Sequence, residues 1–369
     1  SRAEPTPLHP ASAFVHSHGP HRTGEAPLNH RSMHNVKVGV IGCGYWGPKL
    51  VRNFYEIPGA DLRLVCDLRP DRLEHIQSLY GVQVTQDYRE LLAADIDAVA
   101  IATPVSTHHA LGKAALEAGK DILVEKPLTA NSAQARELIA LAEEQGRLIM
   151  VGHTFEYNPA VEYLRNLIMQ GELGTIYYVS ATRVNLGIFQ QDINVLWDLA
   201  PHDISILIYV LGMAPLTVSA RGRAYVQRGI HDVAYVTLDF PDSVMADVRV
   251  SWLDPCKIRR ITVVGSRKMV VYDDVEPVEK IKIYDKGVEM PPYSDTLEEF
   301  RLSYRYGDIT TPPISTEEPL KIECKHFLDC VRSRQRPRSD GRSGLRVVSI
   351  LEAADHSLNN GGLREEVTY

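Results

Sequence analysis

The segment VKVGVIGCGYWGPKLVRNFYEI, residues 36–57, decides the fold class of this chain. Its apolar start is typical of a buried strand, and its second half has the apolar spacing of a helix. Between these parts, Gly42, Gly44 and Gly47 form the pattern G-x-G-x-x-G. Glycines at this spacing permit a tight turn and a close approach of the backbone to a pyrophosphate. We therefore predict that the segment forms the phosphate-binding turn of a dinucleotide site.

A carboxylate ends the next predicted strand, residues 61–67. Asp67 lies about 20 residues beyond the glycines, where an acidic side chain can accept hydrogen bonds from both adenosine ribose hydroxyls. The same charge would repel the 2′-phosphate of NADP, so NAD is the predicted cofactor. Arg69 keeps NADP as the alternative, because an arginine near this position can pair with that phosphate.

Strand and helix patterns alternate through residue 153. Such alternation predicts a doubly wound α/β fold, in which a parallel sheet carries helices on both faces. Asn131 is the predicted cap of the last helix. The predicted strands are 36–42, 61–67, 96–103, 121–127 and 147–153, and the predicted helices are 47–57, 69–81, 107–120 and 130–146.

The pattern changes after Tyr157. A helix at 160–174 precedes a run of strands separated by short turns, which favours an open, mixed or antiparallel sheet covered by helices on one face. We predict a disordered tail at 1–34, a Rossmann dinucleotide-binding domain at 35–155, and an α/β domain for substrate binding and oligomerisation at 156–369. The last helices of this second domain are expected to pack back towards the Rossmann domain. The predicted strands are 175–184, 216–226, 232–240, 243–253, 257–266, 268–274 and 280–286, and the last helices are 318–332 and 343–358.

Composition restricts the partners. A chain of 369 residues exceeds what one core usually organises, and a net charge of -7 argues against nucleic acid, so a small molecule is expected. No apolar run approaches the roughly 20 residues that span a bilayer, so no membrane partner is expected. Five scattered cysteines predict reduced thiols and a cytoplasmic location, with a metal site or disulfide at Cys324 and Cys330 as the less favoured alternative. The six histidines of the tail carry a similar, less favoured metal-binding alternative.

The stretch VLWDLAPHDISILIYVLG, residues 195–212, predicts a buried helix, yet it contains Asp198, His202 and Asp203. Burying a carboxylate costs several kcal/mol unless it is paired or hydrogen-bonded. Asp198 and His202 are four residues apart and share a helix face, so both can point at one group.

Three motifs together resemble the glucose-fructose oxidoreductase, inositol dehydrogenase and MocA (GFO/IDH/MocA) family of NAD(P)-dependent enzymes. They are GCGYWG at 42–47, ATPVSTHHALGKAALEAGKDILVEKPL at 102–128 and WDLAPHDI at 197–204. The resemblance implies a Rossmann domain followed by an α/β domain whose open sheet often builds a dimer or tetramer interface, so a homo-oligomer is expected. It places Lys126 beside the nicotinamide and the reacting hydroxyl, and Asp198 and His202 at the substrate.

Further residues are assigned on the same resemblance. Asp203 departs from the family pattern, which often has the aspartate where this chain has Ser205, so we predict a cap or a salt bridge for it. Implied substrate contacts are His153, Tyr157, Asn158, Arg183 and Asn185. Implied cofactor contacts are Gly42, Gly44, Tyr45, Trp46, Gly47, Asp67, Arg69, Thr103, Pro104, His108, Glu125 and Lys126.

The three central residues suit the oxidation of a secondary alcohol. His202, with an ordinary pKa near 6.5, can take the hydroxyl proton, Lys126 can orient the hydroxyl and stabilise negative charge, and Asp198 can orient its neighbours. Whether Lys126 or His202 takes the proton stays open at this point. The predicted activity is transfer of hydride between nicotinamide and a sugar, nucleotide sugar or cyclitol, and the segments around Tyr157 and Arg183 look more like nucleotide-sugar 3-dehydrogenases. The alternatives are a sugar–sugar oxidoreductase that retains its cofactor and a non-catalytic NAD-binding sensor or repressor.

Overall fold

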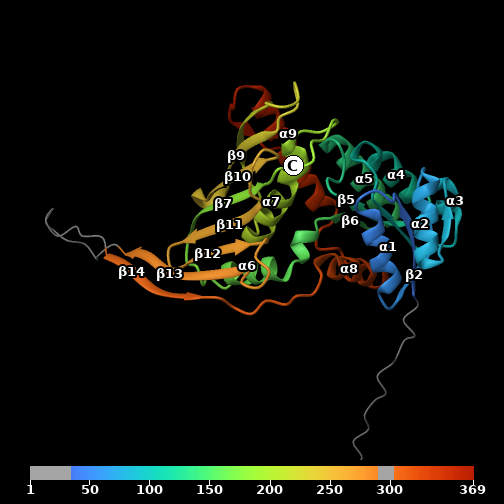
Figure 1. Cartoon of the computed structure of the whole chain (residues 1–369), viewed down its shortest axis with the longest axis horizontal. Coiled ribbons are helices and arrows are strands. Elements are labelled where there is room, and N and C mark those ends of the chain that lie inside the picture. Colours follow the sequence, from blue (N-terminus) through green and yellow to red (C-terminus); the bar gives the residue numbers. More distant parts are fainter. Residues whose placement is uncertain (1–34, 290–302) are drawn as a thin grey trace, which may run out of the picture. The chain divides into compact units, whose positions relative to one another are not determined.

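The computed structural model describes residues 35–289 and 303–369. The first half of the chain forms a sheet of six parallel strands in the order β3-β2-β1-β4-β5-β6, which confirms the predicted doubly wound parallel fold (Figure 1). Its strands are β1 (Val36–Ile41), β2 (Ala60–Cys66), β3 (Gln83–Thr85), β4 (Ala98–Ile101), β5 (Asp121–Glu125) and β6 (Ile149–Gly152). Its helices are α1 (Gly47–Glu56), α2 (Pro70–Tyr80), α3 (Tyr88–Ala93), α4 (Val105–Glu117) and α5 (Ser132–Gln145).

Different helices cover the two faces of this sheet. Apolar residues of α1 and α2 pack on one face, and those of α3, α4 and α5 pack on the other. The predicted cap is confirmed, because the Asn131 side chain accepts a hydrogen bond from the backbone N–H of Gln134 at 2.9 Å. Neither β3 nor α3 was predicted, since three and six residues are too short to display a period.

The second sheet has nine strands in the order β14-β13-β12-β11-β7-β10-β9-β8-β15. Every neighbouring pair is antiparallel except β7 and β10, so the predicted mixed, largely antiparallel sheet is confirmed. The short strand β15 and the strand β14 were not predicted. The strands are β7 (Ile176–Val184), β8 (Thr217–Arg223), β9 (Val233–Asp239), β10 (Met245–Ser251), β11 (Ile258–Gly265), β12 (Met269–Asp273), β13 (Ile281–Glu289), β14 (Ser303–Thr310) and β15 (Glu365–Glu366).

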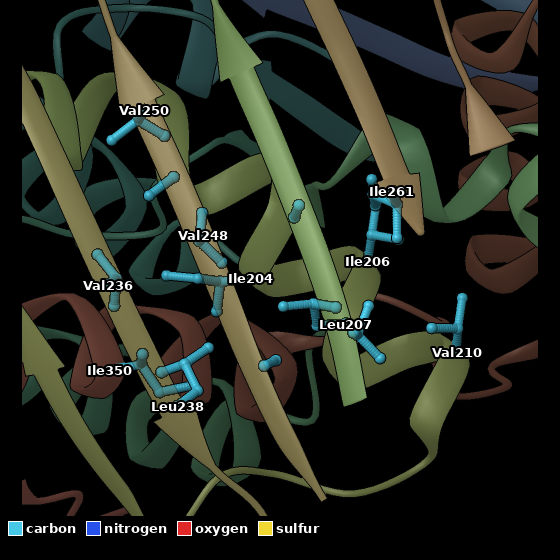
Figure 2. Close-up of a cluster of buried hydrophobic side chains, with 14 of the residues drawn as sticks. Ile204, Ile206, Leu207, Val210, Val236, Leu238, Val248, Val250, Ile261 and Ile350 are labelled. Carbon is cyan, nitrogen blue, oxygen red and sulfur yellow. The ribbon is translucent and has the colours of Figure 1, made fainter. Parts of the chain in front are cut away.

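The helix α7 (Val195–Leu211) forms the centre of the second core. Its residues Ile204 and Leu207 pack against the inward side chains of β9 and β10, among them Val236 and Val248, and Ile350 joins them from α9 (Gly341–Asn359) (Figure 2). Buried and exposed residues alternate along β9 and β10, as expected for a sheet with one covered face. The predicted buried helix at 195–212 is therefore confirmed, and the sheet behind it explains why so much of it is apolar.

The remaining helices join the two sheets. η1 (Thr154–Tyr157) and α6 (Pro159–Met169) follow β6 directly, and α8 (Pro319–Ser333) packs against α1 and η1. Helix α9 contacts α5 and β6 on one side and α7 and β8 on the other. The predicted tail at 1–34 lies outside the described residues. None of the described helices combines the length and hydropathy that crossing a bilayer requires.

Candidate active site

A cavity of about 1760 Å³ lies where the carboxyl ends of the parallel strands meet the first turns of α7. Ligands bind at this edge in open parallel α/β sheets. Three predicted site residues, Gly47, His153 and Tyr157, do not line it. The predicted residues that do are Gly42, Gly44, Tyr45, Trp46, Asp67, Arg69, Thr103, Pro104, His108, Glu125, Lys126, Asn158, Arg183, Asn185, Asp198 and His202.

The glycine turn is packed so closely that two of its positions exclude a side chain. Gly42 has φ +97°, and a Cβ there would lie 2.5 Å from the carbonyl oxygen of Ala102. A Cβ at Gly47 would lie 1.9 Å from the carbonyl oxygen of Gly42. At Gly44, by contrast, the nearest atom would be Nη1 of Arg72 at 3.9 Å, and Gly44 lines the cavity. The residues present therefore fit a dinucleotide, because Gly44 leaves space for a pyrophosphate to approach the backbone.

The start of α1 completes this cradle. No side chain caps the helix at Trp46, so its first N–H groups have no competing side-chain acceptor. Lys49 Nζ lies 3.9 Å from the ring centre of Tyr45 and 4.2 Å from that of Trp46, and all three residues line the cavity. A positive side chain and a positive helix end thus face the place where phosphates would bind.

Asp67 holds the glycine turn from the end of β2. Its Oδ2 accepts a hydrogen bond from the backbone N–H of Cys43 at 2.6 Å, and its Oδ1 accepts one from that of Arg69 at 2.8 Å. The guanidinium of Arg69 makes two hydrogen bonds to Asp71, at 3.0 and 2.6 Å. Because Asp71 already neutralises Arg69, this pairing favours NAD over NADP.

His108 is a positioning residue for two cofactor-lining segments. Its buried ring lies between two carbonyl oxygens, with Nε2 at 2.8 Å from that of Thr103 and Nδ1 at 2.9 Å from that of Pro127. The ring thereby links the turn at Thr103 and Pro104 to the segment that carries Lys126. This gives a physical reason for the T-P-x-x-x-H pattern that the sequence analysis singled out.

Lys126 joins the parallel sheet to α7. Its Nζ donates a hydrogen bond to the backbone oxygen of Asp198 at 2.9 Å, across 72 positions of the chain. Burial lowers the pKa of Lys126, since the charged form loses solvent, while the nearby Asp198 and Glu125 oppose that shift. The ammonium group is thus fixed at the cavity wall beside the first turn of α7.

Asp198 and His202 reach the same cavity without a hydrogen bond between their side chains. The Asp198 carboxylate accepts a hydrogen bond from Trp252 Nε1 at 2.9 Å. The His202 ring meets the ring of Phe155 edge-on, with centroids 5.1 Å apart, and its Nδ1 is buried without a hydrogen-bond partner in the described chain. Burial, and then the charge of Lys126, lowers the pKa of His202 well below 6.5. The imidazole is therefore neutral near pH 7 and able to accept a proton.

Asp203 has the salt bridge that the sequence analysis predicted for it. Arg183 on β7 donates from Nε to Asp203 Oδ2 at 2.7 Å and from Nη2 to Oδ1 at 3.1 Å, with both residues buried. The guanidinium also lies 4.5 Å from the ring centre of Phe155. Arg183 lines the cavity, and its charge is already engaged by Asp203, so the implied contact of Arg183 with substrate stays a prediction.

Two residues that were predicted to contact substrate, Tyr157 and His153, do not line the cavity. Tyr157 is buried, and its hydroxyl lies 2.9 Å from Ser339 Oγ, in the loop between α8 and α9. His153 is 1% exposed, neither of its ring nitrogens has a partner within the described residues, and burial lowers its pKa to about 3. Both are corrected to residues of the wall behind the cavity. Asn158 does line it, and also caps α6 by accepting a hydrogen bond from the N–H of Ala160.

Several residues at the substrate end of the cavity were not predicted from the sequence. Trp252, Lys257 and Arg259 line the cavity from β11 and the turn that precedes it. The loop after β7 lines it with Gly187, Ile188, Gln190, Asp192 and Ile193. Asn185 starts this loop, and its backbone N–H donates to the carbonyl oxygen of Ser251 at 3.2 Å. Only the strand pairing of β7 with β10 and β11 brings these segments together, so no local pattern could have identified them.

Glu125 and Glu323 form a buried acidic pair behind the cofactor end. Burial raises the pKa of Glu125 to about 7, and burial together with Glu125 raises that of Glu323 well above 4.5. Thr154 Oγ1 donates to Glu323 Oε2 at 2.7 Å, whereas Oε1 has no partner in the described chain. Both shifts disfavour two carboxylate anions side by side at the segment of Lys126.

Comparisons with known proteins agree with this geometry. Residues 36–153 match the model of an oxidoreductase family with an NAD-binding Rossmann fold, and residues 161–271 match the model of the GFO/IDH/MocA C-terminal domain. A UDP-N-acetylglucosamine 3-dehydrogenase from Acidithiobacillus ferrooxidans is 27% identical, covering 86% of this chain and 95% of that protein. Its solved structure superposes with a TM-score of 0.74 over 88% of this chain and 98% of that one.

Two further relatives extend the comparison. The scyllo-inositol 2-dehydrogenase (NAD(+)) of Bacillus subtilis (strain 168) is 28% identical, covering 89% of this chain and 95% of that protein. A protein of solved structure from Magnetospirillum magnetotacticum MS-1 is 31% identical, with a TM-score of 0.73, over 87% of this chain and 99% of that one.

Proposed function

The chain belongs to the GFO/IDH/MocA family of NAD-binding oxidoreductases, and we propose that it oxidises a secondary hydroxyl of a sugar, nucleotide sugar or cyclitol. One observation carries the proposal. Lys126, Asp198 and His202 meet at one cavity whose other end is a glycine turn fitted to a dinucleotide. The relatives named above act on a UDP-sugar and on a cyclitol, which supports this substrate class.

The chemistry divides among the three side chains. When bound, NAD supplies the electron acceptor for the carbon that bears the hydroxyl. His202 is neutral near pH 7, because burial lowers its pKa, and it lines the cavity, so it is the proposed acceptor of the hydroxyl proton. Lys126 donates a hydrogen bond to the substrate oxygen and stabilises the charge that develops there. Asp198 orients the hydroxyl from the next turn of the same helix face.

The substrate end favours a nucleotide sugar over an uncharged cyclitol. Lys257 is exposed at the cavity rim and has no ion-pair partner in the described chain. Arg259 lies beside it, in a long pair of 3.4 Å with Asp274. Because neither positive charge is closely paired with a carboxylate, the two side chains are suited to bind an anionic group such as a diphosphate. A free inositol would leave both unused.

The alternative of a non-catalytic sensor finds less support. A module that only binds NAD has no need for Lys126, Asp198 and His202 together at the far end of the cavity. A cofactor-retaining sugar–sugar oxidoreductase would use the same residues, and reduced cofactor bound to the purified protein would distinguish it.

The test is NADH formation with a panel of UDP-sugars, free aldoses and inositols. We expect the NADH absorbance to rise with one of these substrate classes. Lys126→Ala and His202→Ala should each lower kcat by about 10²–10⁴-fold. His109→Ala is the matched control, because His109 lies outside the cavity on α4 and pairs with Glu137. Tight NAD binding without NADH formation from any substrate would favour the sensor instead.

Three further expectations belong to this proposal. We propose a homo-oligomer that uses the sheet face opposite α7, where Tyr178, Tyr235 and Met245 are exposed, and light scattering of the purified protein tests it.

The cytoplasm remains the proposed compartment, supported by five free cysteines, four of them buried. The division into domains at 35–155 and 156–369 also stays a prediction.

A further inference from the structure

The indole of Trp252 connects the catalytic helix to the loop at the substrate end. Trp252 follows β10, is 1% exposed and lines the cavity. Its Nε1 donates a hydrogen bond to Asp198 Oδ2 at 2.9 Å, across 54 positions of the chain. No described side chain hydrogen-bonds to Asp198 Oδ1, so this oxygen is free for a substrate hydroxyl.

The other side of the indole contacts the loop after β7. The N–H of Gly187 donates to the carbonyl oxygen of Trp252 at 3.0 Å, and a Cβ at Gly187 would lie 3.0 Å from Trp252 Cδ1. The ring of Phe189 meets the indole edge-on, with centroids 5.5 Å apart. Gly187, Ile188 and Gln190 line the cavity, so the loop that contacts the indole is also a wall of the substrate end.

We propose that Trp252 is a positioning residue that acts through Asp198. It holds one carboxylate oxygen in place, so that the other is presented to the substrate, and it fixes the distance between Asp198 and the loop at 187–190. Tryptophan suits this role because its apolar body fills the space between loop and helix while its N–H reaches a polar partner. The inference rests on the proposed function, since it assigns Asp198 to the oxidation of a hydroxyl.

The kinetic test compares Trp252→Phe in two backgrounds. Phenylalanine keeps a ring against Gly187 and Phe189 but removes the N–H. We expect kcat to fall by about 10- to 100-fold, as for the loss of one hydrogen bond to a charged group, while KM changes little and the isotope effect of substrate deuterated at the reacting carbon increases. In an Asp198→Ala background, where no side-chain oxygen is left to accept the bond, the same change should cost almost nothing. An equal fall in both backgrounds, or an effect on KM alone, would overturn the proposal.

A second readout does not depend on activity. The chain has three tryptophans, so its indole N–H groups give three signals in a ¹H–¹⁵N spectrum, assigned with Trp46→Phe and Trp197→Phe. We expect Asp198→Asn to move the Trp252 signal and to leave that of Trp46 in place. An unmoved Trp252 signal would contradict the contact, and this measurement remains valid if Trp252→Phe folds poorly. Absence of turnover by the unmodified protein would instead contradict the proposed function.

Discussion

The two ends of the cavity are assembled differently. At the cofactor end, the glycine turn, the start of α1 and Asp67 come from one short segment, and the bond from Cys43 to Asp67 spans only 24 positions. At the substrate end, the bonds from Trp252 and Lys126 to Asp198 span 54 and 72 positions. The cofactor end is thus a local motif, whereas the substrate end exists only after the two sheets have formed.

The two ends of the cavity also differ in the burial of their ion pairs. Arg69 and Asp71 at the cofactor end form an exposed pair, which contributes little to stability. Arg183 and Asp203 at the substrate end form a buried pair. Charges in such a pair depend on each other, because either one alone would be buried without compensation. Changes at the substrate end should therefore affect folding as well as catalysis.

The largest effect that we predict is on the buried pair. Arg183→Ala should lower the free energy of unfolding by about 3–5 kcal/mol, because it leaves the Asp203 carboxylate buried and unpaired. Asp203→Ala should have an effect of similar size. Denaturant titration of each variant measures this.

The double variant provides the decisive comparison for this pair. Arg183→Ala combined with Asp203→Ala should cost less than the sum of the two single losses, since no buried charge remains. Arg69→Ala is the exposed control and should change stability by less than about 1 kcal/mol. Additive losses in the double variant would show that packing against Phe155, rather than charge, dominates.

This contrast explains what the sequence could predict. The strands β1 and β2, the glycine turn, Asp67 and the Asn131 cap all depend on residues close together in the chain, and each was predicted. Lys126, Asp198 and His202 were placed by resemblance. The sequence predicted that Asp203 has a partner, because a buried carboxylate needs one. It could not predict that the partner is Arg183, because the two residues meet only in the folded structure.

Elements were missed where local pattern is weak or absent. β3 and α3 are too short for a period, and β15 has two residues. Trp252 carries no motif, because its role follows from the pairing of β10 with β7. Tyr157 and His153 were assigned to substrate by the family resemblance, but the packing of α8 and of Ser339 encloses that segment.

The next prediction concerns two glycines of the cofactor end. Gly47→Ala should destabilise the apo protein by roughly 1–3 kcal/mol, because its Cβ would lie 1.9 Å from the carbonyl oxygen of Gly42 and the backbone must shift. Gly44→Ala should leave apo stability nearly unchanged, since its Cβ meets only open space and the end of Arg72. It should nevertheless weaken NAD binding about tenfold, if the pyrophosphate approaches there.

Melting curves with and without NAD, together with calorimetric titration, separate the two glycine effects. Gly81→Ala is unsuitable as a control, since φ +64° at this position strains any side chain. Ser78→Ala, on the exposed surface of α2, serves instead. NAD affinity that Gly44→Ala leaves intact would contradict the placement of the pyrophosphate at this turn.

The smallest predicted effect concerns Glu323, which lies where α8 packs behind the cofactor end. Its pKa in the folded protein is raised well above 4.5, chiefly by burial and then by Glu125. Above the unfolded pKa, the folded protein therefore binds more protons than the unfolded chain, and the free energy of unfolding falls as pH rises toward the folded pKa. Glu323→Gln removes this slope. The measured quantity is the melting temperature of Glu323→Gln minus that of the unmodified protein. This difference should be about 3 °C larger at about pH 8.5 than at about pH 5.5.

Comparing the two pH values isolates the charge of Glu323 from its packing. Glutamine can still accept the hydrogen bond of Thr154, and any cost of its new N–H₂ group applies equally at both pH values. Glu144→Gln, on the exposed side of α5, should show no such difference. If Glu323→Gln shifts the melting temperature equally at both pH values, Glu323 binds the same number of protons in the folded and unfolded states over this range. The buried Glu323 carboxyl would then be ionised in the folded protein as it is in the unfolded chain, which would contradict the raised pKa.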